Sequence, residues 1–165
     1  TTEETYMEVI RGKTAMLFEA STHSAAALCG ATAEQAEALR TFGDHLGVAF
    51  QLVDDLLDYR GDAETLGKNV GDDLAEGKPT LPLIYTMREG TPEQKALVRK
   101  AIQKGGIEDL ESIRAAVEAS GSLDYTAQLA RDYVARAIKC LDAIPASEYR
   151  DALVELSEFA VARTH

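Results

Sequence analysis

Three aspartates near the middle of the chain have the spacing of a metal site. They are Asp54, Asp55 and Asp58, which lie with Gln51 in an otherwise apolar run. On a helical wheel at about 100° per residue, all four share one arc. Like charges four residues apart repel each other, so this face predicts a bound cation. Oxygen ligands suit Mg²⁺, which is usually shared with substrate phosphates. A solvated acidic face is the alternative, and the apolar neighbours disfavour it.

Basic residues on both sides of the aspartates are candidates for holding phosphate. Lys13 falls among apolar residues on a wheel of residues 5–28, so we expect it on the inward face, where an ammonium needs a carboxylate or phosphate partner. Thr14 adds a hydroxyl that can bond a ligand or its own helix backbone. Lys68 and Lys78 each follow a glycine, where a ligand can approach closely. The alternatives are a structural ion pair or snorkelling for Lys13, and solvated loop lysines for the other two.

Helices must position these residues, because the sequence has no strand pattern. The periodicity predicts helices over 5–28, 32–59, 80–89, 92–104, 107–119, 123–144 and 147–163. Thr32 with Gln35 and Thr91 with Gln94 have the spacing of capping boxes. Residues 60–80 are predicted to be a glycine-punctuated loop with short helical turns at most, and its length indicates function.

Two glycines lie on the same arc of the second predicted helix as the aspartates. Glycine inside a helix costs about 1 kcal/mol relative to alanine, so Gly43 and Gly47 together indicate a steric need. Either another helix crosses closely there, or an elongated ligand lies along the groove. The sequence leaves both interpretations open.

Composition narrows the class of protein. The 165 residues are 45% apolar, enough for one domain with a core. A net charge of −11 argues against nucleic acid or an anionic membrane surface as the main partner. The sequence shows neither a signal peptide nor an apolar stretch long enough for an integral membrane span. Cys29 and Cys140 fit reduced, partly buried thiols of a cytoplasmic protein. The abrupt start without Met indicates a fragment.

The motifs resemble those of the trans-isoprenyl (polyprenyl) diphosphate synthase family. Residues 48–58 look like the second aspartate-rich motif of this family, and residues 12–15 resemble its upstream Lys-Thr motif. Residues 67–74 and 76–82 resemble its downstream loop. The resemblance implies an all-α isoprenoid synthase helical bundle, of which residues 1–165 would be the C-terminal part of a single domain.

The same resemblance implies a prenyltransferase that condenses isopentenyl diphosphate with an allylic diphosphate through Mg²⁺-assisted ionisation. Asp54 would be a direct ligand of one metal ion, and Asp55 and Asp58 would support that ion directly or through water. The diphosphate would be held by Lys13, Thr14, Gln51, Lys68 and Lys78, of which the first four are also the expected catalytic residues. Family members are commonly homodimers, which implies a homodimer here.

The sequence also departs from the family pattern. Family members carry a first aspartate-rich motif on an earlier helix, and none precedes Lys13 here. We therefore expect the C-terminal half of such an enzyme, inactive by itself. One alternative is a non-catalytic helical subunit of a heteromeric prenyl synthase, which degraded motifs would favour. Another is a terpene cyclase, whose second metal motif usually carries Asn, Ser and Glu. The intact aspartates favour the synthase.

Overall fold

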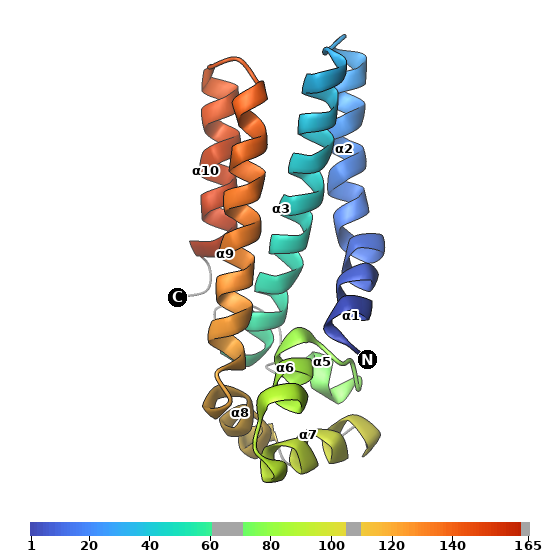
Figure 1. The fold of residues 1–165 in the computed structure, drawn as a ribbon, viewed down its shortest axis with the longest axis vertical. Coiled ribbons are helices and arrows are strands. Elements are labelled where there is room, and N and C mark those ends of the chain that lie inside the picture. The colour runs from blue at the N-terminus through green and yellow to red at the C-terminus, as the bar shows by residue number, and fades with distance from the viewer. Residues whose placement is uncertain (61–70, 105–109, 163–165) are drawn as a thin grey trace. The chain divides into compact units, whose positions relative to one another are not determined.

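The computed structural model describes residues 1–60, 71–104 and 110–162, and within these ranges it contains helices and no strand, which confirms the all-α prediction (Figure 1). The α-helices are α1 (Glu3–Ile10), α2 (Met16–Leu28), α3 (Ala33–Arg60), α5 (Asp72–Ala75), α6 (Leu81–Glu89), α7 (Pro92–Lys104), α8 (Leu110–Ala119), α9 (Ser122–Cys140) and α10 (Glu148–Ala162). A π-helix (Arg11–Ala15) joins α1 to α2, and a 3₁₀ turn (Leu141–Ala143) follows α9. None of the described helices is long and apolar enough to cross a membrane.

The chain folds into two compact units, each made from separate stretches of sequence. Unit 1 contains Thr1–Tyr6 and the described residues between 54 and 127, and unit 2 contains Met7–Val53 and residues 128–162. Helices α1, α3 and α9 each contribute residues to both units. Consequently the three aspartates belong to unit 1, whereas Lys13, Thr14 and Gln51 belong to unit 2.

Several helical segments of unit 2 surround one apolar core. Its buried residues come from α3, α9, the 3₁₀ turn and α10, and Phe18 of α2 packs against them. The members of this core are Phe42, Leu46, Ala137, Leu141 and Ala160. Figure 1 shows these segments as long, neighbouring helices, with short connections joining α2 to α3 and α9 to α10. The apolar period of each helix supplies the face that lines the core.

Close packing between α2 and α3 accounts for the glycines of α3. A Cβ atom added at Gly47 would lie 2.6 Å from Ala15 Cα, and one added at Gly43 would lie 2.6 Å from the Phe18 carbonyl oxygen. The Thr22 hydroxyl, also on α2, donates a hydrogen bond of 2.7 Å to the Leu39 carbonyl of α3. Backbone therefore crosses backbone here, which decides between the two interpretations that the sequence leaves open: the steric need is another helix.

Unit 1 surrounds the last turns of α3 with shorter helices. Leu56 and Tyr59 of α3 are buried together with apolar residues from α5, α6, α7, α8 and the start of α9. These partners are Leu74, Leu83, Val98, Ala101, Ile113, Val117, Leu123 and Ala127. The turns of α3 that carry the aspartates therefore pack on one side against a mainly apolar core, and the aspartates occupy other positions of those turns.

Side-chain caps define several of the helix starts. Both predicted capping boxes form. In each, the threonine hydroxyl accepts a hydrogen bond from the backbone N–H of the glutamine, and the glutamine side-chain oxygen accepts one from the backbone N–H of the threonine, with distances of 2.8 to 3.3 Å. The hydroxyl of Ser147 caps α10 by accepting the Arg150 N–H at 3.2 Å. Thr80 directly precedes α6 without a side-chain capping bond. Its hydroxyl is buried.

Two sequence expectations need correction. Residues 5–28 do not form one uninterrupted α-helix, because the π-helix lies between α1 and α2. A π turn follows an i→i+5 bonding pattern, so it shifts the helical phase of everything that follows it. Cys29 is exposed and not partly buried, since it lies in the turn after α2, whereas Cys140 is half-buried as expected. Both cysteines are free thiols. The predicted break at residues 105–106 lies outside the described residues.

Candidate functional site

The last turns of α3 separate the three aspartates by environment. Asp54 and Asp58 are half-buried, whereas only 2% of Asp55 is exposed. Asp55 accepts a hydrogen bond from the hydroxyl of Tyr6, which is itself buried. The wheel predicts one arc for all three carboxylates, and the structure adds that Asp55 is buried against Tyr6. Asp54 and Asp58 remain as a pair, four residues apart on one side of α3.

Tyr6 keeps its proton in this setting. Burial raises the pKa of Tyr6 far above its usual range, and the negative charge of Asp55 raises it further. Asp73 and Asp54 contribute smaller effects of the same sign. A neutral hydroxyl can donate and a carboxylate accepts, so the polarity of this buried hydrogen bond is fixed.

The oxygen donors of α3 fit a metal ion that takes its other ligands from elsewhere. Among the residues that the structure describes, no three His, Cys, Asp or Glu side chains are grouped closely enough to hold a metal ion by themselves. Asp54 and Asp58 provide carboxylates at i, i+4 spacing in the partly open part of the helix. Mg²⁺ typically binds one or two carboxylates together with waters and substrate phosphates, so this donor set suits it.

Thr14 and Gln51, which lie 37 residues apart in the sequence, meet in unit 2. The Thr14 hydroxyl, in the π-helix, donates a 2.8 Å hydrogen bond to Gln51 Oε1 of α3. Both side chains are half-buried. The Gln51 side chain also carries amide N–H groups, which are donors of the kind that a phosphate accepts.

Lys13 is exposed in this chain, whereas the wheel predicted an inward position for it. Its side chain is exposed, as are Met16 and Leu17, which the same wheel placed inward. Ile10, just before the π-helix, is buried as predicted. Val9, which precedes the π-helix, is more than half exposed as well, so the exposed apolar residues lie on both sides of the π turn. An exposed Lys13 needs no buried partner, and its ammonium is accessible to a ligand.

The two loop lysines have different outcomes. The Lys78 ammonium lies 3.0 Å from Asp73 Oδ1 and 2.6 Å from Glu76 Oε2. Its hydrogen bonds to these two carboxylates raise the pKa of Lys78. To bind a phosphate, the Lys78 ammonium would therefore have to give up its contact with Asp73 or Glu76. Lys68 lies outside the described residues, so its predicted role stays a prediction.

Sequence reasoning missed Tyr6 as a residue of the site. The wheel placed it on the apolar face of the first helix, where tyrosine is ordinarily a packing residue. The signal that was available is its hydroxyl, because a buried Tyr O–H generally needs a hydrogen-bond partner. Which partner it finds depends on contacts between α1 and α3, 49 residues away, and a local pattern does not contain them.

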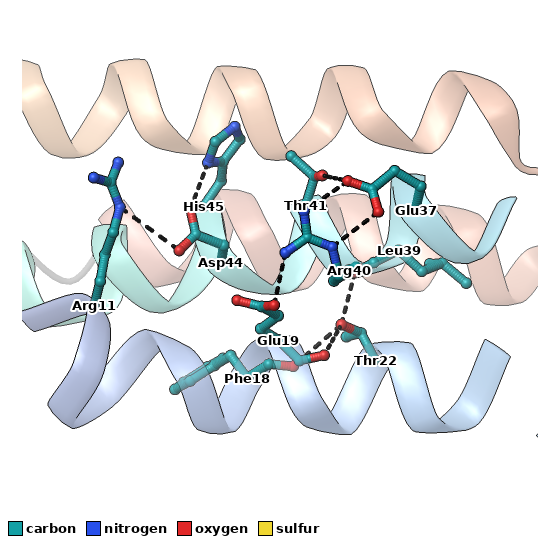
Figure 2. A network of polar contacts seen from close by, with 10 residues as sticks. All are labelled: Arg11, Phe18, Glu19, Thr22, Glu37, Leu39, Arg40, Thr41, Asp44 and His45. Carbon is teal, nitrogen blue, oxygen red and sulfur yellow. Dashed lines mark hydrogen bonds and ion pairs between the residues drawn. The ribbon is translucent and has the colours of Figure 1, made fainter. Parts of the chain in front are cut away.

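Polar contacts join α2 and the π-helix to α3 within unit 2 (Figure 2). Arg40 of α3 binds Glu37 through two hydrogen bonds of 2.7 and 2.9 Å and reaches Glu19 of α2 at 2.7 Å. Farther along, Arg11 lies 3.7 Å from Asp44 and donates a 3.0 Å hydrogen bond to the Tyr133 hydroxyl of α9. These contacts fix the register of the helices around the core.

His45 in this network should make the stability of the protein depend on pH. Burial lowers the pKa of His45 below its ordinary value of 6.5, and Arg136 and Arg11 lower it further. Asp44, 3.2 Å away, opposes this without overcoming it. The unfolded chain therefore binds the proton first, so His45 is expected to reduce the free energy of unfolding as the pH falls below about 6.5.

The measurement for His45 is urea unfolding of the wild type and of His45→Gln between pH 8 and pH 5. The difference between their free energies of unfolding should change in favour of the variant as the pH falls. Identical pH profiles for the two proteins would contradict the assignment.

An apolar pocket opens on unit 2 beside this network. It has a volume of about 210 Å³ and is lined by Phe18, Leu46, Phe50, Leu156, Phe159 and Ala160. Phe50 directly precedes Gln51 on α3, so the same turn of the helix presents an apolar ring and a polar amide. A pocket with this lining suits a hydrocarbon ligand.

Comparison with known proteins places the fold and these residues in a family. The polyprenyl synthetase family model matches residues 1–120. Octaprenyl diphosphate synthase of Escherichia coli K12 is 51% identical over 163 residues, covering 98% of this chain and 50% of that protein. All-trans-nonaprenyl-diphosphate synthase (geranyl-diphosphate specific) of Rhodobacter capsulatus is 50% identical over 163 residues, with coverages of 99% and 50%.

A solved structure agrees with the sequence relatives. The polyprenyl synthase of Caulobacter crescentus CB15, crystallised with calcium and isoprenyl diphosphate, superposes with a TM-score of 0.93 at 43% identity. The match covers 99% of this chain and 51% of that one. The chain therefore belongs to the polyprenyl synthetase family, and it spans about half the length of the curated relatives it matches.

Proposed function

We propose that this chain is the C-terminal, diphosphate-binding part of a polyprenyl diphosphate synthase. Such an enzyme is a prenyltransferase that condenses isopentenyl diphosphate with an allylic diphosphate. The observation that carries the proposal is the family match over residues 1–120, because this range includes every predicted site residue from Lys13 to Lys78. The relatives that are about half identical to the chain are named as octaprenyl and nonaprenyl diphosphate synthases.

The proposal gives each side chain a role. Asp54 and Asp58 would hold Mg²⁺, with Asp55 in support. When bound, the metal ion would supply charge neutralisation for the departing diphosphate. The Lys13 ammonium, the Thr14 hydroxyl, the Gln51 amide and the lysines 68 and 78 would hold the diphosphate oxygens. A leaving group that gains negative charge is stabilised by cations and donors fixed in advance, which is the chemistry these residue types provide.

The apolar pocket supports an isoprenoid substrate. Its lining of phenylalanine, leucine and alanine side chains offers no charge to a ligand, and Phe50 links it to Gln51 in sequence. An isoprenyl chain is a branched hydrocarbon, so such a lining can bury it without leaving polar groups unpaired. The Caulobacter relative was crystallised with isoprenyl diphosphate, which is a substrate of this type.

Exposed apolar side chains support a further polypeptide that completes the fold. Val9, Met16 and Leu17 are each more than half exposed, and so is Phe159 at the pocket. Apolar patches of this kind mark surfaces that another polypeptide covers. We infer that the part supplying the first aspartate-rich motif covers some of them. A homodimer would cover others, and two free cysteines fit a cytoplasmic enzyme.

The first prediction from this proposal concerns activity. The purified 165-residue chain alone should not incorporate isopentenyl diphosphate into longer prenyl diphosphates, because it would hold only one of the two aspartate-rich motifs. Coexpression with the remaining half of the Escherichia coli octaprenyl diphosphate synthase should restore Mg²⁺-dependent incorporation, measured with radiolabelled isopentenyl diphosphate.

The outcomes of this experiment separate the hypotheses. Condensation by the chain alone would overturn the prediction of inactivity. A folded complex of the two halves that shows no activity would favour the alternative, a non-catalytic helical subunit of a heteromeric prenyl synthase. The matched control is the same complex carrying Asp54→Asn, which should assemble equally well and remain inactive.

A further inference from the structure

The first turns of α1 are anchored firmly within unit 1. The Glu3 carboxylate lies 2.7 Å from Arg88 Nη1 of α6 and accepts a 2.7 Å hydrogen bond from the Tyr125 hydroxyl of α9. Arg88 stacks over Tyr125 and Tyr85, with 5.5 and 5.1 Å to the ring centroids. The Thr2 hydroxyl caps the helix by accepting the Thr5 N–H at 3.2 Å. This turn therefore has little freedom to rotate or slide.

Tyr6 follows Glu3 by three residues and so lies on the same side of α1. Only 6% of Tyr6 is exposed, and its hydroxyl donates to Asp55, of which 2% is exposed. A carboxylate buried to this degree needs hydrogen-bond donors to offset the loss of water. The anchored turn of α1 thus brings the Tyr6 hydroxyl, a hydrogen-bond donor, to Asp55. In the sequence Asp55 lies between Asp54 and Asp58.

We propose that Tyr6 is a positioning residue for the metal site: by holding Asp55 inward, it fixes the rotation of the last turns of α3 that present Asp54 and Asp58. Without the hydroxyl, the Asp55 carboxylate loses a buried donor and turns toward water. That movement places a third negative charge beside the pair and shifts the two carboxylates from their positions. The inference rests on the proposed function for the identity of the ligand, Mg²⁺ with a diphosphate.

Isothermal titration of the 165-residue chain with inorganic pyrophosphate in the presence of Mg²⁺ tests this proposal. Tyr6→Phe removes one oxygen atom and is expected to weaken binding about tenfold, while far-ultraviolet circular dichroism stays unchanged. The matched control is Tyr133→Phe, which removes another buried tyrosine hydroxyl with a hydrogen-bond partner, Arg11, in unit 2. Its affinity should remain within twofold of the wild type.

A double-mutant cycle separates positioning from general stability. In an Asp55→Ala background, Tyr6→Phe should cause no further loss of pyrophosphate affinity, because the carboxylate that it positions is absent. Mn²⁺ titrations followed by electron paramagnetic resonance should show the same coupling in the metal affinity. A purely structural role for Tyr6 would instead weaken binding equally in both backgrounds. If Tyr6→Phe does not fold, Glu3→Gln is measured instead. This variant keeps the Tyr6 hydroxyl but weakens the contacts of Glu3 with Arg88 and Tyr125, and it is expected to lose less pyrophosphate affinity than Tyr6→Phe would.

The results distinguish the proposed ligand, Mg²⁺ with a diphosphate, from the proposed positioning role of Tyr6. A wild-type chain that binds no pyrophosphate with Mg²⁺ would overturn the proposed ligand and the positioning role with it. A wild-type chain that binds, with Tyr6→Phe binding within twofold of it, would overturn the positioning role alone. Selective loss in Tyr6→Phe that disappears in the Asp55→Ala background would establish the role.

Discussion

Replacing Asp54 by asparagine is expected to weaken Mg²⁺-dependent binding of pyrophosphate by at least about 100-fold. Asp54 is the predicted direct ligand, and an amide oxygen without formal charge is a much poorer partner for a hard divalent cation. Loss of groups that only support metal ligands already costs about 10- to 100-fold. Titration calorimetry of the purified variant measures the effect, and chelation of the metal with EDTA should abolish binding to the wild type in the same assay.

A matched variant separates ligation from net charge. Asp132→Asn makes the same chemical change at an exposed carboxylate of α9, whose hydrogen bond comes from Gln128 of the same helix. Its pyrophosphate affinity should equal that of the wild type. Equal losses in Asp54→Asn and Asp132→Asn would show that the overall negative charge, and not a metal ligand, governs binding, and this would contradict the assignment of Asp54.

Gly47→Ala is expected to destabilise the protein by about 1–3 kcal/mol, the range for overpacking a tightly packed interior. The added methyl group would meet Ala15 Cα at 2.6 Å and the Phe18 side chain at 3.2 Å. Because the nearest atom belongs to the backbone, α2 and α3 must move apart to admit the methyl group. Alanine is the better helix former by about 1 kcal/mol, so this packing cost must exceed the gain in propensity.

The control for Gly47 is another helical glycine with open space around it. A Cβ atom at Gly12 would have no neighbour within 4 Å, so Gly12→Ala should be neutral or stabilising by up to about 1 kcal/mol. Urea unfolding of the three proteins gives the comparison. If both alanine variants gain stability, the helices can separate without cost, and close packing would not explain the glycine.

Local features of the fold could be predicted from the sequence. The extent of α3 and the two capping boxes agree with expectation because apolar period and cap chemistry act within a few residues. The π-helix at Arg11–Ala15 could not be predicted in this way, because a wheel assumes a constant angle per residue. The exposure of Lys13 and of its apolar neighbours Met16 and Leu17 could not be predicted either, because a wheel does not show what covers a face.

The candidate site shows a similar limit. Residue types and spacing identified the aspartates of α3, and the structure adds the Thr14 to Gln51 contact within unit 2. The inward turn of Asp55 depends on Tyr6, and the pairing of Lys78 depends on nearby carboxylates whose geometry a linear pattern does not specify. The charge and spacing of residues in the sequence indicate which of them are candidates for a site. Tertiary contacts determine which of these side chains are accessible to a ligand.

The division of the chain between the two units has a consequence for synthesis on the ribosome. Unit 1 has all of its described residues once position 127 has emerged, whereas unit 2 still lacks residues 128–162 of α9 and α10. Until then, Phe42 and Leu46 lack their core partners Ala137, Leu141 and Ala160. The aspartate-bearing unit can therefore complete its core first during translation, while the apolar face of α3 in the other unit stays uncovered and prone to aggregation until α9 and α10 have emerged.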